Sequence, residues 1–442
     1  MPTPSNTLDQ LRAGQLKGIQ RLDLSCGLTE FPREIFDLAD SLQVLNLSGN
    51  ALTSLPNDLP RLHQLRVVFA SNNLFTTLPA VLGQCPQLQM VGFKANQIQS
   101  VPAAALPPQL RWLILTDNQI DTLPASIGEC SHMQKLMLAG NRLKTLPDQL
   151  AQCQQLELLR ISANQLGMMP PWLVGLPRLA WLACAGNPFS DACAQAHQHA
   201  PPTAIEWRNL RLQQVLGEGA SGVVYQALLS TPGGSHHDSC EPRAVAVKLF
   251  KGAVTSDGWP HSELAACLAV ARQPHPNLIP VIGPLAAHPE GTAGLVMQLV
   301  APRFATLAGP PSLQTCTRDV YPAGSRFSMQ KVKRIALGVA RAAAHLHAVG
   351  LLHGDLYAHN LQCDADGSCL LGDMGGASFL PADPAASRAL QRLEVRAFGC
   401  LLEELLAHGI QTPPAAFSAL QARCMSAPAQ RPLFDEIMQS LI

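Results

Sequence analysis

Apolar residues recur along the first half of the chain with a period close to 23 residues. Within each period the pattern is Leu-x-x-Leu-x-Leu-x-x-Asn or a close variant, and the first six copies continue into an apolar-proline step such as Leu55-Pro56. The asparagines that mark the period are spaced by 22 or 23 residues: Asn50, Asn73, Asn96, Asn118, Asn141, Asn164 and Asn187. So regular a repeat predicts a stack of similar units, because one unit cannot bury its apolar face alone.

The pattern also predicts what each position in a copy does. The Leu positions are expected to point inward and stack on the next copy, while the residues between them face outward on a sheet of short strands. The Asn side chain can bond the exposed backbone of its own turn and of its neighbours, which predicts a ladder of side chains. An irregular first copy begins at Leu22, and residues 1–18 are expected to cap the open end.

The outward positions form two columns that are unusually apolar in the middle of the array. The first column is Arg21, Val44, Val67, Met90, Trp112, Lys135, Leu158 and Trp181, and the second is Asp23, Asn46, Phe69, Gly92, Ile114, Met137, Arg160 and Ala183. Exposed apolar patches of this kind mark partner surfaces. A protein partner or substrate is therefore expected here, anchored by Phe69, Trp112, Met137 and Trp181. The alternatives are a mildly apolar free surface, or a patch covered by the chain's own second half.

A glycine-rich turn opens the second half. Two alternating apolar runs flank the sequence Gly217-Glu-Gly-Ala-Ser-Gly222-Val-Val224, which predicts a β-hairpin. The glycines let a backbone approach phosphate groups without a Cβ clash. A dinucleotide-binding loop of similar sequence would open a helix instead, so that fold is excluded. The residues predicted to bind a nucleotide here are Gly217, Glu218, Gly219, Ala220, Ser221, Gly222 and Val224.

A lysine ends the next buried strand pattern, Val245-Ala-Val-Lys248. A buried lysine needs an anionic partner, and the natural choices are nucleotide phosphates and a glutamate on a helix. Glu263 follows fifteen residues later in a helical stretch and is the predicted ion-pair partner. The strand pattern 294–300 is expected to lead to a hinge. Residues predicted to line the nucleotide base are Ala246, Met297, Gln298 and Val300.

Two carboxylates and an amide stand close together further along. The sequence His353-Gly-Asp-Leu-Tyr-Ala-His-Asn360 follows an Ala-rich helical pattern and precedes Asp373-Met-Gly375. One Asp can accept the proton of an attacking hydroxyl, while an Asn and a second Asp can hold the metal ions that bridge nucleotide phosphates. Asp355 fits the first role, and Asn360 and Asp373 fit the second.

These motifs carry two resemblances. Residues 19–189 resemble the leucine-rich repeat family. Residues from about 210 to 442 resemble the eukaryotic-type protein kinase family through the glycine-rich turn, V-A-V-K, H-x-D-x-x-x-x-N and D-x-G. Glu394-Val-Arg-Ala-Phe-Gly399 and Arg431-Pro432 match later kinase motifs. The order of the two parts looks like a bacterial group of such kinases.

The resemblance implies an α/β repeat solenoid, shaped as a horseshoe, followed by an α+β two-lobed kinase fold. The expected domains are residues 1–189 and 209–442, joined by a linker over 190–208. The implied reaction uses ATP and Mg²⁺ to move the γ-phosphate to a protein hydroxyl, of Ser or Thr. Asp355, Lys248 and Glu263 are the implied catalytic residues, and Asn360 and Asp373 are the implied metal ligands.

Several positions depart from the family pattern. Gly354 replaces the usual Arg before the catalytic Asp, which argues against control by phosphorylation of the activation segment. That segment is short and has no A-P-E tripeptide. Tyr357 and His359 fit neither the Ser/Thr nor the Tyr kinase pattern. Gln362 stands where an apolar residue usually floors the nucleotide base. These departures leave two alternatives open: a nucleotide-binding pseudokinase scaffold, and a kinase-fold phosphotransferase for small molecules.

Composition narrows the setting further. The formal net charge is zero, from 31 basic and 31 acidic residues, which argues against nucleic acid or an anionic membrane as a bulk partner. No signal peptide and no membrane span is recognised. Cys85, Cys130 and Cys153 recur at one repeat position, which predicts buried thiols in a reducing compartment, the cytoplasm. His197 and His199 have no third metal ligand nearby, so a linker is expected there.

Overall fold

The computed structural model describes residues 6–196, 202–230, 242–252 and 254–442. The chain divides into two compact units, Met1–Leu179 and Ala180–Ile442. This boundary lies before the eighth repeat copy, whereas the sequence suggested a boundary after it. The reason is that the eighth copy packs within the second unit, as described below.

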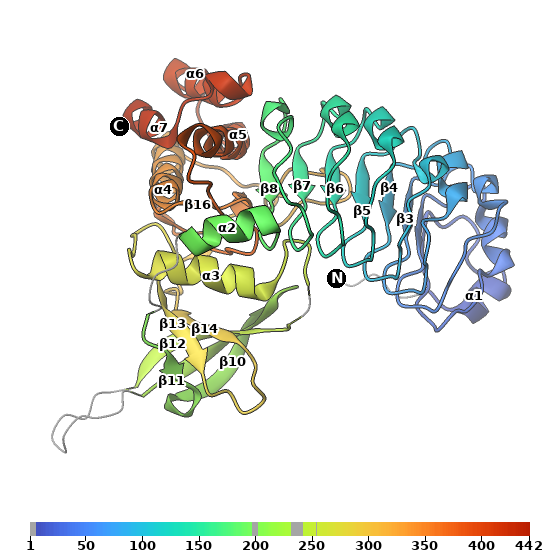
Figure 1. Cartoon of the computed structure of the whole chain (residues 1–442), viewed down its shortest axis with the longest axis horizontal. Coiled ribbons are helices and arrows are strands. Elements are labelled where there is room, and N and C mark those ends of the chain that lie inside the picture. The colour runs from blue at the N-terminus through green and yellow to red at the C-terminus, as the bar shows by residue number, and fades with distance from the viewer. Residues whose placement is uncertain (1–5, 197–201, 231–241, 253) are drawn as a thin grey trace. The chain divides into compact units, whose positions relative to one another are not determined.

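The first unit is a solenoid of short parallel strands (Figure 1). Thr7 caps the first helix by accepting a hydrogen bond from the Gln10 amide, 3.1 Å away. Strands pair in chain order, as the repeat pattern predicted. The helix is α1 (Leu8–Arg12), and the strands are β1 (Arg21–Asp23), β2 (Val44–Asn46), β3 (Val67–Phe69), β4 (Met90–Gly92), β5 (Trp112–Ile114), β6 (Lys135–Met137) and β7 (Leu158–Arg160).

Short 3-10 turns connect these strands in place of full α-helices. Each turn follows a strand and an apolar-proline step or its equivalent, and buries one to three side chains, such as Leu82 and Ile127. The turns are η1 (Arg33–Leu38), η2 (Leu59–Arg61), η3 (Ala80–Gln84), η4 (Ala103–Ala105), η5 (Ala125–Glu129), η6 (Asp148–Gln152) and η7 (Leu173–Gly175).

Strand register confirms the predicted columns. The first residues of successive strands face one another, as in Met90 beside Trp112, and so do the third residues, as in Ile114 beside Met137. The central residues, among them Leu113 and Leu136, are fully buried. The inward and outward positions therefore lie where the alternation along each strand placed them.

The predicted asparagine ladder is present. Asn141 donates from Nδ2 to the carbonyls of Leu115 and Leu138, both at 2.9 Å, and its Oδ1 accepts from the Ile120 amide at 3.0 Å. Asn118 makes the same kind of bonds one copy earlier. Each side chain thus satisfies backbone groups of adjacent copies that the short strands leave unpaired.

On the outward columns, Phe69, Trp112 and Met137 are partly buried, whereas Met90 between them is only 4% exposed. Phe69 lies against Gly92, where an added Cβ would come within 2.5 Å of the ring. Trp112 donates from Nε1 to the Met137 sulfur at 3.3 Å, and the Lys135 ammonium lies 4.4 Å from the Trp112 ring centroid. The first unit therefore presents a ridge of packed apolar and aromatic groups.

The second unit begins with the eighth repeat copy and a helix. Strand β8 (Trp181–Ala183) is followed by α2 (Pro188–Ala196), whose Ser190 hydroxyl donates to the Asn187 carbonyl at 2.9 Å. The first part of the expected linker, 190–208, is therefore helical, and Ser190 within it is buried. His197 and His199 lie outside the described residues.

A six-stranded sheet forms the smaller lobe of this unit. Its order is β10-β11-β12-β14-β13-β9, and its core includes Ala227, Val245, Val247 and Val296. Helix α3 (Pro260–Ala271) packs on it (Figure 1). The strands are β9 (Ile205–Glu206), β10 (Leu210–Glu218), β11 (Gly222–Leu229), β12 (Arg243–Phe250), β13 (Val281–Ala286) and β14 (Gly294–Gln298), with the turn η8 (Trp207–Asn209) between the first two.

Helices dominate the larger lobe, which also holds two small sheets (Figure 1). The helices are α4 (Met329–Ala348), α5 (Pro384–Ala407), α6 (Ala415–Cys424) and α7 (Phe434–Leu441), with the turns η9 (Ala358–Asn360) and η10 (Pro428–Gln430). One sheet joins β15 (Ala305–Thr306), β17 (Leu361–Cys363) and β18 (Cys369–Leu371), and the other joins β16 (Leu351–Leu352) and β19 (Ser378–Phe379). This two-lobed arrangement agrees with the predicted fold class.

Two further expectations concern apolar surfaces and thiols. No helix among the described residues has both the length and the apolar character that crossing a bilayer requires.

Cys85, Cys130 and Cys153 are free and buried, and burial raises their pKa to about 11, 11 and 12. The repeat cysteines therefore act as small apolar core groups, as predicted.

A buried acid on α5 makes the stability of the second unit depend on pH. Burial and the charge of Asp319 together raise the pKa of Glu404 from 4.5 to about 7, although Tyr321 donates its hydroxyl to Glu404 Oε2 at 3.2 Å. The folded chain therefore holds a proton that the unfolded chain releases between about pH 4.5 and 7. Its stability falls as the pH rises through this window, by on the order of 3 kcal/mol.

Replacing Glu404 by Gln is expected to remove most of this pH dependence, because the amide keeps the acceptor for Tyr321 and cannot ionise. Denaturant unfolding at pH 5, 7 and 8.5 measures the effect. The variant should be more stable than the natural protein at pH 8.5 and similar at pH 5. Glu403→Gln, at the neighbouring half-exposed position, is the matched control. Equal pH slopes in Glu404→Gln and the natural protein would contradict this expectation.

Candidate functional site

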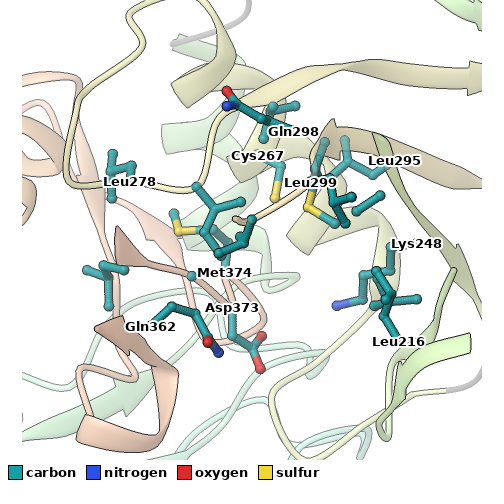
Figure 2. A pocket seen from close by; sticks show the side chains of 18 of the residues that line it. Leu216, Lys248, Cys267, Leu278, Leu295, Gln298, Leu299, Gln362, Asp373 and Met374 are labelled. Atoms are coloured by element: carbon teal, nitrogen blue, oxygen red, sulfur yellow. The ribbon is translucent and has the colours of Figure 1, made fainter. Parts of the chain in front are cut away.

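A cavity of about 560 Å³ lies between the two lobes of the second unit (Figure 2). It is lined from the sheet of the smaller lobe, from the segment after β14 and from β17 and β18. Of the residues predicted to bind a nucleotide or act on it, the lining includes Gly217, Val224, Ala246, Lys248, Glu263, Met297, Gln298, Val300, Gln362 and Asp373. The glycine-rich turn, the strand of Lys248 and the D-x-G motif thus contribute to one cavity, whereas Asp355 and Asn360 are not among its lining residues.

Much of the apolar lining was not predicted. Apart from Met374 in the D-x-G motif, these residues belong to no catalytic motif, and mainly their place in strands or in helix α3 could have indicated that they are buried. The lining residues that the sequence analysis missed include Leu216, Cys267, Val270, Leu278, Ile279, Leu295, Leu299, Phe304, Leu371 and Met374. Burial raises the pKa of the Cys267 thiol, so this cysteine contributes an apolar surface and not a nucleophile.

Lys248 and Glu263 form an ion pair at the inner end of the cavity. Lys248 lies on β12 and Glu263 on the first turn of α3, and Lys248 Nζ donates to Glu263 Oε1. The side chains are 12% and 4% exposed. Burial by itself would lower the pKa of Lys248, but the carboxylates of Glu263 and Asp373 raise it, so the lysine stays charged. The expected pair is present and adds a fixed cation beside Asp373.

The glycine-rich turn joins β10 and β11, as the hairpin prediction required. Gly222 packs so closely on β12 that an added Cβ would lie 2.4 Å from the Leu249 carbonyl oxygen. By contrast, a Cβ on Gly219 would meet nothing within 4 Å. The amide of Gly219 donates to the Gly222 carbonyl at 2.9 Å and closes the turn. One glycine is therefore needed for strand packing, while the turn itself stays open to a ligand.

The remaining residues of this turn do not line the cavity. Glu218, Gly219, Ala220, Ser221 and Gly222 are absent from its wall. Glu218 instead pairs with Lys251, whose Nζ lies 2.6 Å from Oε1 and 3.1 Å from the Gly219 carbonyl oxygen. Their predicted nucleotide contacts stay predictions.

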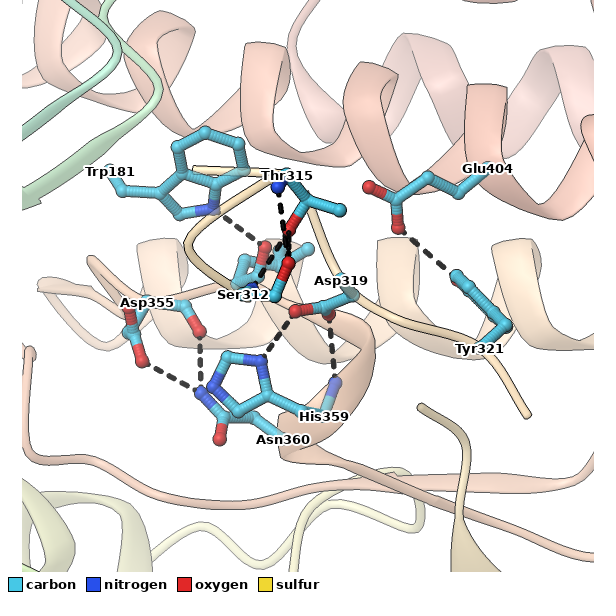
Figure 3. Close-up of polar contacts among 10 residues, drawn as sticks. Trp181, Ser312, Thr315, Asp319, Tyr321, Asp355, His359, Asn360 and Glu404 are labelled. Atoms are coloured by element: carbon cyan, nitrogen blue, oxygen red, sulfur yellow. Dashed lines mark hydrogen bonds and ion pairs between the residues drawn. The ribbon is translucent and has the colours of Figure 1, made fainter. Parts of the chain in front are cut away.

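Asp355 and Asn360 are joined directly in the loop that runs from β16 to β17. Asn360 Nδ2 donates to both the carbonyl oxygen and Oδ2 of Asp355, each at 2.8 Å (Figure 3). The five-residue spacing curls the loop through the turn η9, so that the two side chains meet. Because both of these bonds use the amide nitrogen, the amide oxygen of Asn360 points away from Asp355 (Figure 3).

The loop is tied at its start by two buried side chains. His353 contacts the Gly372 carbonyl oxygen through Nε2 at 2.9 Å and accepts the Asp355 amide at Nδ1, 3.2 Å away. Glu394 Oε1 on α5 accepts the Gly354 amide at 2.7 Å. Burial would raise the pKa of Glu394, but the hydrogen bonds from His347 and Gly354 lower it, so it acts as a buried anion. This is the anchoring helix that the sequence motif predicted.

Asp373 sits in a conformation that L-residues seldom adopt. Its φ is 53°, in the left-handed region, and its Oδ1 accepts the Gly375 amide at 3.1 Å. Such strain persists only where surrounding contacts hold it, and it concentrates at functional sites. The next glycine, Gly376, lies against Asp355, because an added Cβ there would be 3.1 Å from the Asp355 Cβ. The two carboxylates therefore belong to one cluster.

The sequence analysis missed a histidine–aspartate pair next to this cluster, formed by Asp319 and by His359, the residue before Asn360. Asp319 accepts from the amide of His359 at 3.0 Å, and its other oxygen contacts the His359 ring at Nδ1, 2.8 Å away (Figure 3). Burial would lower the pKa of His359, but Asp319 raises it, with smaller contributions from Asp355 and Asp373. No motif marks Asp319, which lies forty residues before its partner.

The polar side chain of Gln362, which lines the cavity, is held by a hydrogen bond to a neighbouring strand. Gln362 Nε2 on β17 donates to the Thr306 hydroxyl on β15 at 3.0 Å. The amide of this side chain is therefore fixed, and its oxygen is the group left to face a ligand. The departure from an apolar floor, noted from the sequence, thus has a defined structural setting.

Trp181 was expected to anchor a foreign partner, and this expectation is wrong. Its side chain is 1% exposed and stacks on the ring of Tyr357, with centroids 4.3 Å apart and an interplanar angle of 4°. Alternation along a strand gave the direction of the side chain but could not show what covers it. The alternative considered from sequence, cover by the chain's own second half, applies at this position.

The geometry described above agrees with comparisons to known protein families. A model of the protein tyrosine and serine/threonine kinase family matches residues 210–399. Two leucine rich repeat models match residues 41–62 and 108–166. These matches fall on the same two parts of the chain that the sequence motifs separated.

Individual relatives are protein kinases that match part of the chain. The chain is 29% identical to CBL-interacting protein kinase 22 of Oryza sativa subsp. japonica over 39% of its own length and 37% of the relative's. It is 27% identical to serine/threonine-protein kinase mos of Gallus gallus, over 39% and 48%. It is also 27% identical to the calmodulin-binding receptor kinase CaMRLK of Arabidopsis thaliana, over 44% and 29%.

The matched region spans between about a tenth and a half of the length of these and the other similar proteins. The likeness therefore concerns a part of each protein, and the kinase family match at residues 210–399 lies inside the second unit. The repeat matches and the parallel strands agree in the same way for the first unit. The chain therefore joins an array of leucine-rich repeats to a protein kinase domain.

Proposed function

We propose that the chain is an ATP-dependent protein kinase that transfers the γ-phosphate to a serine or threonine hydroxyl. The observation that carries this proposal is the buried Lys248–Glu263 pair in the wall of the cavity that Asp373 also lines, together with the Asp355–Asn360 bond in the loop that leads to β17. The kinase family match and the printed names of relatives, several of them serine/threonine-protein kinases, support it.

Lys248 is proposed to hold the phosphates of the nucleotide. A charged lysine fixed by a buried glutamate keeps its position while a polyanion enters, so little reorganisation is needed. Asp373 also interacts electrostatically with Lys248. The positive charge of the lysine offsets the negative charges of Asp373 and Glu263, so a negatively charged ligand can bind beside them. Ala246, Val224 and Met297 provide apolar walls for the base. Gln298 and Val300, next to them, are proposed to lie along its edge.

The donors at the other end of the cluster fit Mg²⁺. Asp373 offers a carboxylate and Asn360 an amide oxygen, the hard oxygen ligands that Mg²⁺ prefers. Mg²⁺ keeps several waters and binds through one or two protein groups together with phosphates, so two side chains are enough. When bound, Mg²⁺ would neutralise charge on the phosphate oxygens.

Asp355 is the proposed base. The acceptor hydroxyl would attack the γ-phosphorus while the bond to the bridging oxygen of ADP breaks, and its proton would pass to the Asp355 carboxylate. Asn360 holds one oxygen of this carboxylate, which orients the other toward the acceptor. Most of the rate enhancement is expected from this positioning and from electrostatics.

Location and partners are proposed on separate grounds. Buried free thiols along the repeats favour a reducing compartment, so we expect the protein in the cytoplasm.

The ridge formed by Phe69, Trp112 and Met137 favours a protein acceptor or partner on the repeats. Leucine-rich repeats with such a surface commonly bind proteins, which the family matches support.

The proposed acceptor surface predicts that Trp112→Ala weakens phosphorylation of the protein acceptor by raising its KM. The kcat and the KM for ATP should stay unchanged, because Trp112 lies in the first unit. Steady-state kinetics with a protein that the enzyme phosphorylates gives the KM for the acceptor, the KM for ATP and the kcat. Trp172→Ala, a second half-buried tryptophan of the same unit, is the control. An unchanged acceptor KM would remove Trp112 from the surface.

Asp355→Asn is expected to lower phosphate transfer by about 10² to 10⁴ fold, because general base catalysis contributes on that order. The new amide oxygen can still accept from Asn360, so the loop should keep its shape. Transfer of labelled γ-phosphate to the chain itself and to a generic protein acceptor measures the effect. Thermal stabilisation by Mg-ATP should persist. Asp366→Asn, at an exposed turn position, is the matched control.

Three outcomes of that assay separate the candidate functions. Label on protein that the Asp355→Asn variant fails to transfer supports the kinase. Stabilisation by Mg-ATP without any label favours a scaffold that binds nucleotide. Label on small hydroxyl compounds but on no protein favours a small-molecule phosphotransferase.

Lys248→Met should abolish transfer and also destabilise the fold by about 3 to 5 kcal/mol, because Glu263 would be left buried without its counter-ion. The double variant Lys248→Met, Glu263→Leu should regain most of that stability while staying inactive, since both charges are then absent. Denaturant unfolding and phosphate transfer are measured on the same preparations. Transfer at the natural rate by either variant would exclude the proposed role of Lys248.

A further inference from the structure

The eighth repeat copy contacts the loop that carries Asp355. Trp181 Nε1 donates to the carbonyl oxygen of Leu356 at 3.0 Å (Figure 3), and its ring stacks on Tyr357. Leu356 and Tyr357 are the two residues that follow Asp355. Both rings are almost fully buried. The indole therefore fixes the backbone and the side chain immediately after the proposed base.

The same copy contacts the segment that follows Asp373. The Cys184 amide donates to the Ser378 hydroxyl on β19 at 3.2 Å. Strand β19 pairs with β16, which leads directly into the loop of Asp355. One repeat copy thus holds the two segments that carry the proposed base and one proposed metal ligand.

Three backbone segments meet at Gly354. A Cβ at this position would lie 2.4 Å from the Leu182 carbonyl oxygen and 2.3 Å from that of Gly376, and the φ of Gly354 is 73°. Any other residue would therefore push apart the repeat strand, the loop and the activation segment. The Arg that the kinase family pattern has at this position would not fit between these carbonyl oxygens.

Helix α2 extends these contacts to the helix that carries Glu263. It runs beside α3 (Figure 1), and the two helices line a small cavity of about 110 Å³ together with Ala377 and Phe379. The lining residues on the helices are Ser190, Asp191 and Ala194 on α2 and His261, Ser262 and Ala265 on α3. The eighth copy and α2 therefore contact the loop of Asp355 and the segment after Asp373, and they lie beside the helix that carries Glu263.

We propose that the eighth repeat copy is a built-in brace of the kinase site, with Trp181 as a positioning residue that holds the loop of Asp355 in its working arrangement. This inference rests on the proposed function and deepens it. In this chain, packing by a repeat takes the place of the contact between a loop arginine and an activation-segment phosphate. The site is thus assembled without a prior phosphorylation step.

Three full-length variants test the brace. Trp181→Ala removes both the ring stack and the bond to Leu356. Trp181→Phe keeps an aromatic ring on Tyr357 and loses only the bond. Trp172→Ala removes a tryptophan of the first unit as a matched control. The kcat and the KM for ATP are measured for each, with thermal stabilisation by Mg-ATP as the test of a folded site.

The brace predicts a loss in kcat and not in nucleotide affinity. Trp181→Ala should lower kcat by about tenfold to a hundredfold, since a displacement of about 1 Å can cost that much, while the KM for ATP changes by less than about threefold. Trp181→Phe should recover most of the kcat, and Trp172→Ala should match the natural protein. A Trp181→Ala variant with the natural kcat would overturn the proposal.

A second variant and a second readout decide the remaining cases. If Trp181→Ala loses stabilisation by Mg-ATP, Ser378→Ala replaces it, since this change removes the hydroxyl that the Cys184 amide and thiol contact. The brace predicts a lower kcat for this variant as well. If the natural protein transfers no phosphate, the proposed function fails, and hydrogen exchange still tests the brace. Trp181→Ala should speed amide exchange over residues 353–360, and an unchanged exchange rate would overturn the proposal.

Discussion

The close approach of three backbone segments at Gly354 is the constraint on which the kinase site depends. The carbonyl oxygens of Leu182 and Gly376 lie so near that no side chain fits between them. The Gly354 amide is meanwhile held by the buried carboxylate of Glu394. The loop of Asp355 is thus fixed from the repeat side, from the activation segment and from α5. Loops that a phosphate orders in other kinases gain their position from new charge contacts, whereas here we propose that packing holds the loop.

Charge in the site follows from this packing. Lys248 stays protonated because Glu263 and Asp373 outweigh the effect of burial. Asp319 similarly favours the charged form of His359 on the other side of the cluster. The acidic groups that would repel nucleotide phosphates are therefore each matched by a nearby cation or a bound amide. The apolar cavity beside them lowers the local dielectric, which strengthens these interactions and the attraction for a polyanion.

Sequence patterns predicted the features that depend on local spacing. The period of the asparagines gave the strand register and the ladder, because one copy repeats the geometry of the last. The Lys248–Glu263 pair followed from the need of a buried cation for an anion. Asp319, Tyr321 and Glu404 were missed because their contacts join distant segments that no motif marks. Trp181 was assigned to a partner because alternation fixes the direction of a side chain and not its cover.

The central claim is that the chain's own contacts assemble an active kinase site. The most direct test is the time course of phosphate transfer by the full-length protein after phosphatase treatment, with intact mass recording its phosphorylation state. We expect the enzyme to transfer phosphate to an acceptor at full rate from the first turnover, while the enzyme itself is still unphosphorylated. A lag that ends only as the enzyme gains phosphate on residues 373–383 would contradict it, because the site would then need a modification that the brace was proposed to replace.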